Sequence, residues 1–480
     1  AGGRKHLRDL IVYEMHIDDF TDEFRGARAP LDSIRDKLDY LADLGINAIL
    51  FMPWTAWKNR DFDWGYETFQ YFAVEYRYAN DLNRPAEKIS WLKKLISACH
   101  ARGIHVIMDG VFNHASEDFP YKHLYKNRDE CPYTGTFGGT FAGLQDLNFN
   151  NVCTREFIRD VCLYWIDVFG IDGIRFDNTV NYHVLSDSKG IPKLLEDIQS
   201  HLDKIGEKNF SMTLEHLEQS AATITNETSA TSYWDNAMYE RCFHYLWNHQ
   251  IDARILNSFN NDRYLNTSEK AATIYLGNHD HSHVAWQAGA RENLGSLRWY
   301  KTQPYAIALL TCPGVPMLQN GQEFGEDYWI PENDEGTGRR VLPRPLRWKL
   351  TKDSIGIELY RLYKRLIELR KQFPGLRSRN FYPDYWEEWQ TRFKPDGFGV
   401  DTEKQAVIYH RWGHDPAGVL QRFIIVLNFS DQPQPLTVQF PENGEWTDLL
   451  SDYNGTWKIE VNNYRIDLNV SSNWGHIFFR

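Results

Sequence analysis

The first two-thirds of the chain alternates short apolar runs with longer stretches in which apolar residues recur every three or four positions. Short apolar runs are typical of buried β-strands, whereas the wider spacing is typical of one face of an α-helix. The runs that predict strands are residues 11–15, 47–52, 104–109, 171–177, 210–215, 272–277 and 315–318.

Helical spacing fills the segments between many of these strands, at residues 31–41, 89–99, 157–169 and 359–369. The first three helices are expected to end at Gly45, Gly103 and Gly170. The third is expected to begin at Thr154, and the last is expected to end near Gly375. Repeated strand–helix–strand units imply parallel strands. This number of units predicts a closed (β/α)₈ barrel, an α/β fold of the TIM type.

The pattern changes in two places. Residues 115–152 are rich in Gly, Asn and Tyr and have no helical period, which predicts a small subdomain inserted after the third strand. From about residue 383 onward, short β-rich runs alternate with turn sequences, which predicts an antiparallel β-sandwich of roughly 100 residues. We therefore predict a barrel at 1–114 and 153–378, an inserted subdomain at 115–152 and a C-terminal sandwich at 379–480.

The net charge of the chain is −12. A surface this acidic repels phosphate, so we expect neither nucleic acid nor anionic membrane lipid as a partner. Aromatic residues make up 15% of the chain, and flat faces at this density suit stacking on sugar rings, although most must fill the core. No apolar run approaches the ~18 residues that span a bilayer. The sequence begins Ala1-Gly2-Gly3, so removal of a leader stays open, and with it the choice between a secreted and a cytoplasmic protein. The oligomeric state stays open as well.

The cysteines show no CxxC spacing and are scattered over residues 99, 131, 153, 162, 242 and 312. In a chain of this length, such a distribution indicates buried free thiols rather than a disulfide framework.

Four predicted strands end in an acidic residue or lead directly into one, namely Asp109, Asp177, Glu215 and Asp280. The chemistry of a (β/α)₈ barrel lies at these strand ends. Acids that converge on one rim differ in pKa, because like charges a few ångströms apart raise the pKa of one of them. A proton donor beside a carboxylate nucleophile is what retaining glycoside hydrolysis requires. The structural alternative for each single acid is a helix cap or a surface ion pair.

Six motifs around these acids, in order along the chain, resemble those of the α-amylase family of glycoside hydrolases. The resemblance extends over residues 10 to 480. The motifs are Asp109-Gly110-Val111-Phe112-Asn113-His114, Leu144-Gln145-Asp146-Leu147-Asn148, Gly173-Ile174-Arg175-Phe176-Asp177, Leu214-Glu215-His216, Asn278-His279-Asp280, and Gly314-Val315-Pro316 followed by Gly321-Gln322-Glu323.

The resemblance implies Asp177 as nucleophile, Glu215 as general acid/base and Asp280 as stabiliser of the transition state. Arg175 precedes the nucleophile by two residues on the same strand and would keep Asp177 ionised by direct hydrogen bonding.

Further residues of these motifs would bind the substrate. The resemblance implies that Asp109, His114 and His279 contact the sugar and that the Tyr66 ring stacks under it. Residues 54, 57 and 64, all Trp in the same loop as Tyr66, are either further stacking platforms or packing residues.

The expected substrate is an α-glucan or a malto-oligosaccharide. In many endo-acting members a Lys-His pair follows the nucleophile, but here Asn178 follows Asp177 and the pair is absent. The chain length of the substrate and the linkage preference therefore stay open. An α-glucan transglycosylase, which uses the same covalent intermediate, is the alternative within the family. A non-catalytic sugar-binding member is disfavoured because all three acids are present.

The same motifs raise two possibilities for a metal site. Asn113 and Asp146 correspond to positions that bind a structural Ca²⁺ in many members of the family, and both offer oxygen ligands that suit this ion. The run from His279 to His283 contains two His-x-His steps, which raises a metal hydrolase as a rival. A catalytic zinc site needs three convergent ligands, and no other strand end supplies a histidine with a partnering carboxylate.

Overall fold

The computed structural model describes residues 3–58, 62–81, 83–84, 86–141, 144–330, 341–450 and 456–480. The chain divides into two compact units, and each is described by itself. The first comprises Ala1–Trp234, Leu265–Thr273 and Thr337–Leu346, and the second comprises Asp235–Tyr264, Ile274–Gly336 and Arg347–Arg480. The domain boundaries predicted from the sequence stay a prediction.

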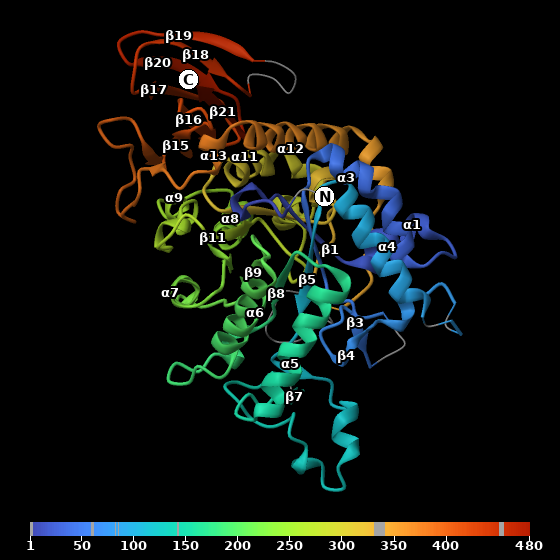
Figure 1. Cartoon of the computed structure of the whole chain (residues 1–480). Coiled ribbons are helices and arrows are strands. Elements are labelled where there is room, and N and C mark those ends of the chain that lie inside the picture. Colours follow the sequence, from blue (N-terminus) through green and yellow to red (C-terminus); the bar gives the residue numbers. More distant parts are fainter. Residues whose placement is uncertain are drawn as a thin grey trace. The chain divides into compact units, whose positions relative to one another are not determined.

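A closed eight-stranded barrel confirms the predicted fold class (Figure 1). Its order is β1-β12-β11-β10-β9-β8-β5-β2, and the pairs from β1 through β2, β5, β8 and β9 to β10 are parallel. The strands are β1 (Val12–Met15), β2 (Ala48–Phe51), β5 (His105–Gly110), β8 (Gly173–Phe176), β9 (Ser211–Leu214), β10 (Ser232–Asp235), β11 (Ala271–Tyr275) and β12 (Val315–Gln319).

The sequence pattern missed one barrel strand, β10. Its four residues, Ser-Tyr-Trp-Asp, are all buried although two are polar, so neither alternation nor an apolar run marks them. The Ser232 hydroxyl is satisfied inside the barrel by the Thr273 hydroxyl, 2.7 Å away.

Helices lie at each of the four places where helical spacing predicts one, with different ends, and several further α-helices were not predicted. The α-helices are α1 (Ile17–Arg25), α2 (Pro30–Ser33), α3 (Leu38–Leu44), α4 (Glu87–Ala101), α5 (Val152–Tyr164), α6 (Ile191–Ile205), α7 (Ala221–Glu227), α8 (Ala237–Asn248), α9 (Ile255–Ser258), α10 (Val284–Gly289), α11 (Gln303–Thr311), α12 (Ser354–Gln372) and α13 (Pro374–Arg377). Gly45 ends α3 in the left-handed conformation, as predicted.

Two predicted helix ends are wrong. Thr154 does not begin α5, because the Asn151 side chain caps the helix by accepting the Cys153 amide at 2.9 Å, and the Thr154 hydroxyl instead donates to a backbone carbonyl. The long helix α12 ends at Gln372 rather than near Gly375, because Pro374 cannot continue it and starts the short α13.

The segment between β5 and α5 is held by short pairings. β6 (His114–Ala115) pairs antiparallel with β7 (Gln145–Asp146), and β3 (Thr55–Trp57) pairs antiparallel with β4 (Thr68–Val74) nearby in the sequence. The described residues between β6 and β7 hold two 3₁₀ turns and no α-helix, as predicted from the absence of a helical period.

The C-terminal part confirms the antiparallel sandwich. One sheet has the order β13-β15-β16-β21-β18-β19, with β14 beside β15, and the other consists of β17 and β20. The strands are β13 (Phe381–Tyr382), β14 (Gly399–Asp401), β15 (Ala406–His414), β16 (Leu420–Asn428), β17 (Gln434–Gln439), β18 (Gly444–Asp448), β19 (Trp457–Val461), β20 (Arg465–Val470) and β21 (Trp474–Phe479). β18 was missed because only one of its five residues is strongly apolar.

The six cysteines are free, as predicted, and all are buried except Cys153 in the first turn of α5. Among the described helices, none combines the length and the apolar character that crossing a membrane would take.

Candidate active site

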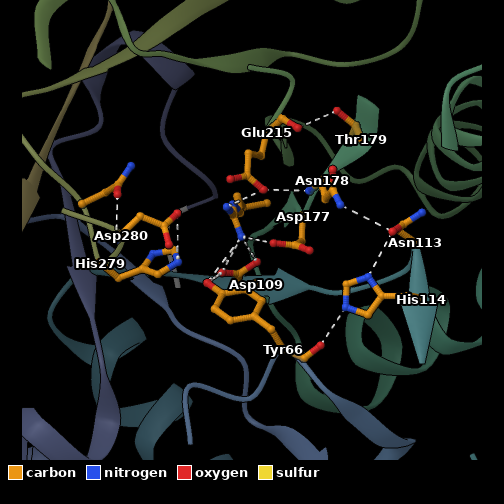
Figure 2. A network of polar contacts seen from close by, with 12 residues as sticks. Tyr66, Asp109, Asn113, His114, Asp177, Asn178, Thr179, Glu215, His279 and Asp280 are labelled. Carbon is orange, nitrogen blue, oxygen red and sulfur yellow. Dashed lines mark hydrogen bonds and ion pairs between the residues drawn. The ribbon is translucent and has the colours of Figure 1, made fainter. Parts of the chain in front are cut away.

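A single guanidinium organises the acids of the first unit (Figure 2). Arg175 is 1% exposed, and its Nη1 donates to both oxygens of Asp109 at 2.7 and 2.8 Å and to Asp177 Oδ1 at 3.0 Å. Its Nη2 lies 2.8 Å from Glu215 Oε2. Asp109, Arg175, Asp177 and Glu215 form what we call the carboxylate centre. Three of the predicted site acids therefore meet around one cation.

The barrel ladder sets the spacing of this centre. Asp109 and Arg175 are register partners across β5 and β8, so their side chains leave neighbouring strands at the same level. The Asp177 amide donates to the Gly110 carbonyl at 3.0 Å, and the Glu215 amide donates to the Phe176 carbonyl at 2.9 Å. The parallel ladder thus continues into both acids and fixes their backbones.

Two aromatic rings hold the Arg175 side chain in place. The guanidinium carbon lies 4.2 Å from the centroid of the Trp234 ring and 5.9 Å from that of Tyr66. The Tyr66 hydroxyl donates to Asp109 Oδ2 at 2.7 Å, so this residue contacts the centre through its hydroxyl. Trp234 was missed by the sequence analysis because it lies on β10, the strand that the apolar pattern did not mark.

Asn178 and Thr179 position Glu215. The Asn178 amide donates to Glu215 Oε2 at 2.7 Å, which requires the left-handed backbone of Asn178, with φ of 47°. The Thr179 amide and hydroxyl both donate to the Glu215 carbonyl, at 2.9 and 2.8 Å. The sequence analysis noted Asn178 only for the absence of a Lys-His pair, and its role could have been found from the tolerance of Asn for this conformation.

The electrostatics favour a shared proton. Burial, reinforced by the neighbouring Glu215 and Asp109 carboxyls, raises the pKa of Asp177 well above its ordinary value, and Arg175 opposes this rise without cancelling it. The proton belongs to the Asp177–Glu215 pair rather than to either residue alone. The contact predicted for Arg175 is present, and its effect on the ionisation of Asp177 stays a prediction.

Both ring nitrogens of His114 have an oxygen atom nearby, and a neutral ring can donate to one of them. Nε2 lies 2.9 Å from the Tyr66 carbonyl and Nδ1 lies 3.0 Å from Asn113 Oδ1. Burial lowers the pKa of His114 to about 4, so the ring is neutral at neutral pH. His114 thus ties the loop of Tyr66 to the end of β5, and its predicted contact with a sugar hydroxyl stays a prediction.

The calcium prediction fits one of its two residues. Asp146 Oδ1 is buried without a hydrogen-bond partner among the described residues, and burial raises the pKa of this carboxyl. The Asn113 side-chain oxygen is already near His114 Nδ1 and near Asn178 Nδ2, at 3.5 Å. Over the part of the chain that the structure describes, no three His, Cys, Asp or Glu side chains gather in a way that could hold a metal. Calcium stays a prediction, and no chemical step below depends on it.

His279 and Asp280 belong to the second unit, directly beyond β11. The Asp280 amide donates to Asn278 Oδ1 at 3.0 Å, and His279 Nε2 lies 3.7 Å from Asp280 Oδ2. The Asp280 side chain is 30% exposed, against 11% for Asp177 and for Glu215. Asp280 is thus the most accessible of the three acids to a molecule from solvent.

The residues after Asp280 form a brace rather than a metal site. The His281 ring stacks on Tyr239 with 3.6 Å between centroids, and His283 Nε2 lies 3.0 Å from the Asn320 carbonyl. The Ser282 hydroxyl accepts the Ile330 amide at 2.7 Å. Because these groups turn toward separate partners, the metal-hydrolase alternative receives no support from the described residues.

The three tryptophans of the Tyr66 loop are packing residues. Trp54, Trp57 and Trp64 are all buried. Trp54 packs on Trp165, and Arg344 lies over the Trp64 ring. Packing is therefore the correct alternative for all three.

Comparisons with known proteins give one consistent result. The family model described as "Alpha amylase, catalytic domain" matches residues 15–137 and 133–344. The chain is 25% identical over 443 residues to malto-oligosyltrehalose trehalohydrolase of Saccharolobus solfataricus, covering 80% of this chain and 72% of that protein. It is 25% identical over 432 residues to pullulanase of Bacillus subtilis, covering 78% of this chain and 58% of that protein.

Solved structures support the same fold. An α-amylase from Anoxybacillus superposes with a TM-score of 0.75 at 19% identity, covering 99% of this chain and 98% of that one. A pullulanase from Anoxybacillus sp. LM18-11 complexed with maltotriose superposes with a TM-score of 0.77 at 20% identity, covering 100% of this chain and 71% of that one. At these identities the likeness concerns the fold alone.

Proposed function

Because the chain belongs to the α-amylase family of glycoside hydrolases, we propose that it cleaves α-glucosidic bonds in starch-like glucans or malto-oligosaccharides with retention of configuration. The observation that carries this proposal is the pairing of Asp177 with Glu215 around Arg175 at the ends of adjacent strands. A proton shared by two adjacent carboxyls supplies both the acid and the nucleophile that the two-step mechanism needs.

In the first step, one carboxylate oxygen of Asp177 attacks the anomeric carbon of the sugar. The bond from that carbon to the glycosidic oxygen breaks while Glu215 gives its proton to the leaving oxygen. The products of this step are the shortened glucan and a covalent glycosyl ester on Asp177.

In the second step, the Glu215 carboxylate takes a proton from water, and the water oxygen attacks the anomeric carbon. The ester bond breaks, Asp177 leaves as a carboxylate, and Glu215 is again protonated. Two inversions at the anomeric carbon give net retention.

The contacts of Glu215 assign different tasks to its two oxygens. The Asn178 amide and Arg175 Nη2 both approach Oε2, at 2.7 and 2.8 Å. An oxygen that faces two donors acts as an acceptor, so Oε1 is the oxygen that carries the proton when Glu215 is the protonated member of the pair. Arg175 Nη1 stabilises the Asp177 carboxylate before attack and after release.

Asp280 is the proposed stabiliser of the transition state. Its partly exposed carboxylate would bind sugar hydroxyls, and these bonds strengthen as positive charge develops on the flattening ring. Transglycosylation uses the same steps with a sugar hydroxyl in place of water, so the identity of the attacking group decides between the two activities.

A product profile by chromatography tests this proposal. Wild-type protein and the Asp177→Asn variant are each incubated with soluble starch, pullulan, cyclodextrin and maltoheptaose. We expect shorter oligosaccharides from wild type only, and the substrates consumed define the linkage preference. Products longer than the input would identify a transferase, and absence of products on every substrate would overturn the proposal.

A further inference from the structure

The C-terminal sandwich contains a hollow that the proposed chemistry does not use. It is a cavity of about 520 Å³, within the size range of ligand sites in proteins. We call it the sandwich groove. Six of the residues that line it carry rings: Tyr382, Phe398, His410, Trp412, Phe440 and Tyr464.

The groove exists because one sheet of the sandwich is shorter than the other. Alternate residues of β15 face the core, and Ala406 and Ile408 are covered by the β17–β20 sheet within the hydrophobic core. His410 and Trp412 continue the same face. The covering sheet ends at the pair formed by Gln439 and Arg465, so this end of the face has no sheet above it.

The rings along the uncovered face form a continuous row. The centroids of Trp412 and His410 are 4.9 Å apart, and their planes differ by 35°. Phe398 lies 6.3 Å from His410, and Tyr382 lies 5.6 Å from Phe398. Phe398 is buried, whereas Tyr382, His410 and Trp412 are partly exposed and present flat surfaces of the size of a sugar ring.

Tyr464 forms one rim of the groove and is held there by an uncommon backbone. Asn463 and Tyr464 both have positive φ, at 52° and 59°, a conformation that an aromatic residue rarely adopts. The Tyr464 amide donates to Asn443 Oδ1 at 2.6 Å, and its carbonyl accepts the Phe440 amide at 2.8 Å. These bonds keep the ring 54% exposed at the rim.

The polar groups of the groove suit an uncharged ligand. Asp396 accepts the Tyr382 hydroxyl, and Arg422 Nε lies 3.5 Å from Glu442 Oε1, so both charges have partners. His410 Nε2 is buried and has no hydrogen-bond partner in the described structure. Burial lowers the pKa of His410 to about 4, so its ring is neutral. The groove thus offers hydrogen-bonding groups beside ring faces, and its charged groups, Asp396 and Arg422, both have polar partners.

From this combination, we propose that the sandwich groove binds a segment of an α-glucan chain, as a second sugar site built from a different sheet than the carboxylate centre. The class of ligand, a neutral oligosaccharide, follows from the groove itself. The choice of an α-glucan rests on the proposed function. A protein that holds one part of a long glucan in the groove would retain the polymer between cleavage events.

Isothermal titration of the full chain with maltoheptaose tests the proposal. The Asp177→Asn background is used so that the probe is not consumed. We expect two binding events in this background, and only one after Trp412→Ala or Tyr464→Ala, with affinity at the groove reduced at least about tenfold. Hydrolysis of maltotriose by wild-type protein carrying either groove substitution should be unchanged.

Trp457→Ala is the matched control, since Trp457 is 67% exposed on β19, at the far edge of the same sheet from β13. It should leave both binding events intact. Tyr464→Ala guards against misfolding of Trp412→Ala, because Tyr464 lies at the rim rather than in the core. Unchanged stoichiometry and affinity in both groove variants would overturn the proposal. Two binding events in a chain that cleaves no glucan would overturn the proposed function, while the proposal that the sandwich groove binds a glucan would stand.

Discussion

The carboxylate centre and the sandwich groove lie at strand ends in two different sheets and treat charge in opposite ways. The centre packs Asp109, Asp177 and Glu215 around one buried guanidinium, and the pKa of Asp177 is displaced far from its ordinary value. In the groove, the charged side chains are paired and the histidine is neutral.

This difference separates the requirements of reaction from those of binding. Breaking a glycosidic bond needs a proton and a nucleophile, and two carboxyls whose pKa values are pushed apart supply both at neutral pH. Holding a neutral sugar needs ring faces and hydrogen bonds, and an uncompensated charge would add a desolvation cost without benefit. One ligand class can therefore be served by two regions with unrelated chemistry.

The largest expected effect comes from neutralising either acid of the pair. Glu215→Gln should lower kcat by roughly 10²- to 10⁴-fold, the contribution of a general acid, and Asp177→Asn at least as much. Circular dichroism should show an unchanged fold, and glucan binding at the groove should persist. Near-normal turnover in either variant would refute the assignment of the pair.

Arg175→Ala should shift the pH profile as well as reduce activity. Removing the cation takes away a group that lowers the pKa of Asp177, so this pKa rises further. The carboxylate is then formed only at higher pH, and the acidic limb of kcat/KM moves upward. Arg175→Lys, which keeps the charge, should move it less. An unmoved limb in Arg175→Ala would show that the ion pair does not tune the nucleophile.

Tyr66→Phe should have a smaller effect on the same centre. It removes one hydrogen bond to the Asp109 carboxylate, a loss of about 1.5–3 kcal/mol that corresponds to roughly 10- to 100-fold in kcat/KM. Steady-state kinetics on maltoheptaose measures it. If the Tyr66→Phe variant had wild-type kinetics, the ring at this position would be enough to position Asp109 and Arg175 without the hydroxyl.

The two regions should also differ in their response to pH. Glucan binding at the groove should be constant between pH 5 and 8 and weaken only as pH falls through about 4, where His410 becomes protonated. Hydrolysis should depend on pH through the carboxylate centre, because burial and the neighbouring carboxyls raise the pKa of Asp177. Titration of the Asp177→Asn variant at several pH values measures the first. If the affinity of the groove for glucan changed with pH in the same way as hydrolysis does, the proposed difference between the two regions would be contradicted.

The smallest expected effect concerns calcium. Added Ca²⁺ should raise the melting temperature of wild type by about one degree for each kcal/mol of binding linkage, and Asp146→Asn should abolish this shift. Differential scanning fluorimetry with and without a chelator gives the readout. Equal shifts in both proteins would remove Asp146 from the calcium prediction.

Much of this architecture could be predicted from the sequence because its apolar runs are long and fully buried. β2 and β5 were found within one or two residues of their ends. β10 was missed because polar residues occupy it and are satisfied by partners far along the chain, such as Thr273. Pairing across a barrel is not visible in a local window of sequence.

The same limit applies to the site. The acids were found because each follows an apolar strand, but Trp234 under Arg175 and the Asn178 amide on Glu215 depend on register between strands. The groove was not anticipated either, since it arises where β17 and β20 stop short of β15. Side chains alone carry no signal of where a neighbouring sheet ends.

The central claim is that Asp177 and Glu215 perform a double displacement. Proton NMR of the anomeric signals during the first minutes of maltoheptaose cleavage tests it most directly, before mutarotation mixes the anomers. The account predicts that the newly formed reducing end appears first as the α-anomer. First appearance of the β-anomer would show a single displacement and contradict the covalent intermediate on Asp177.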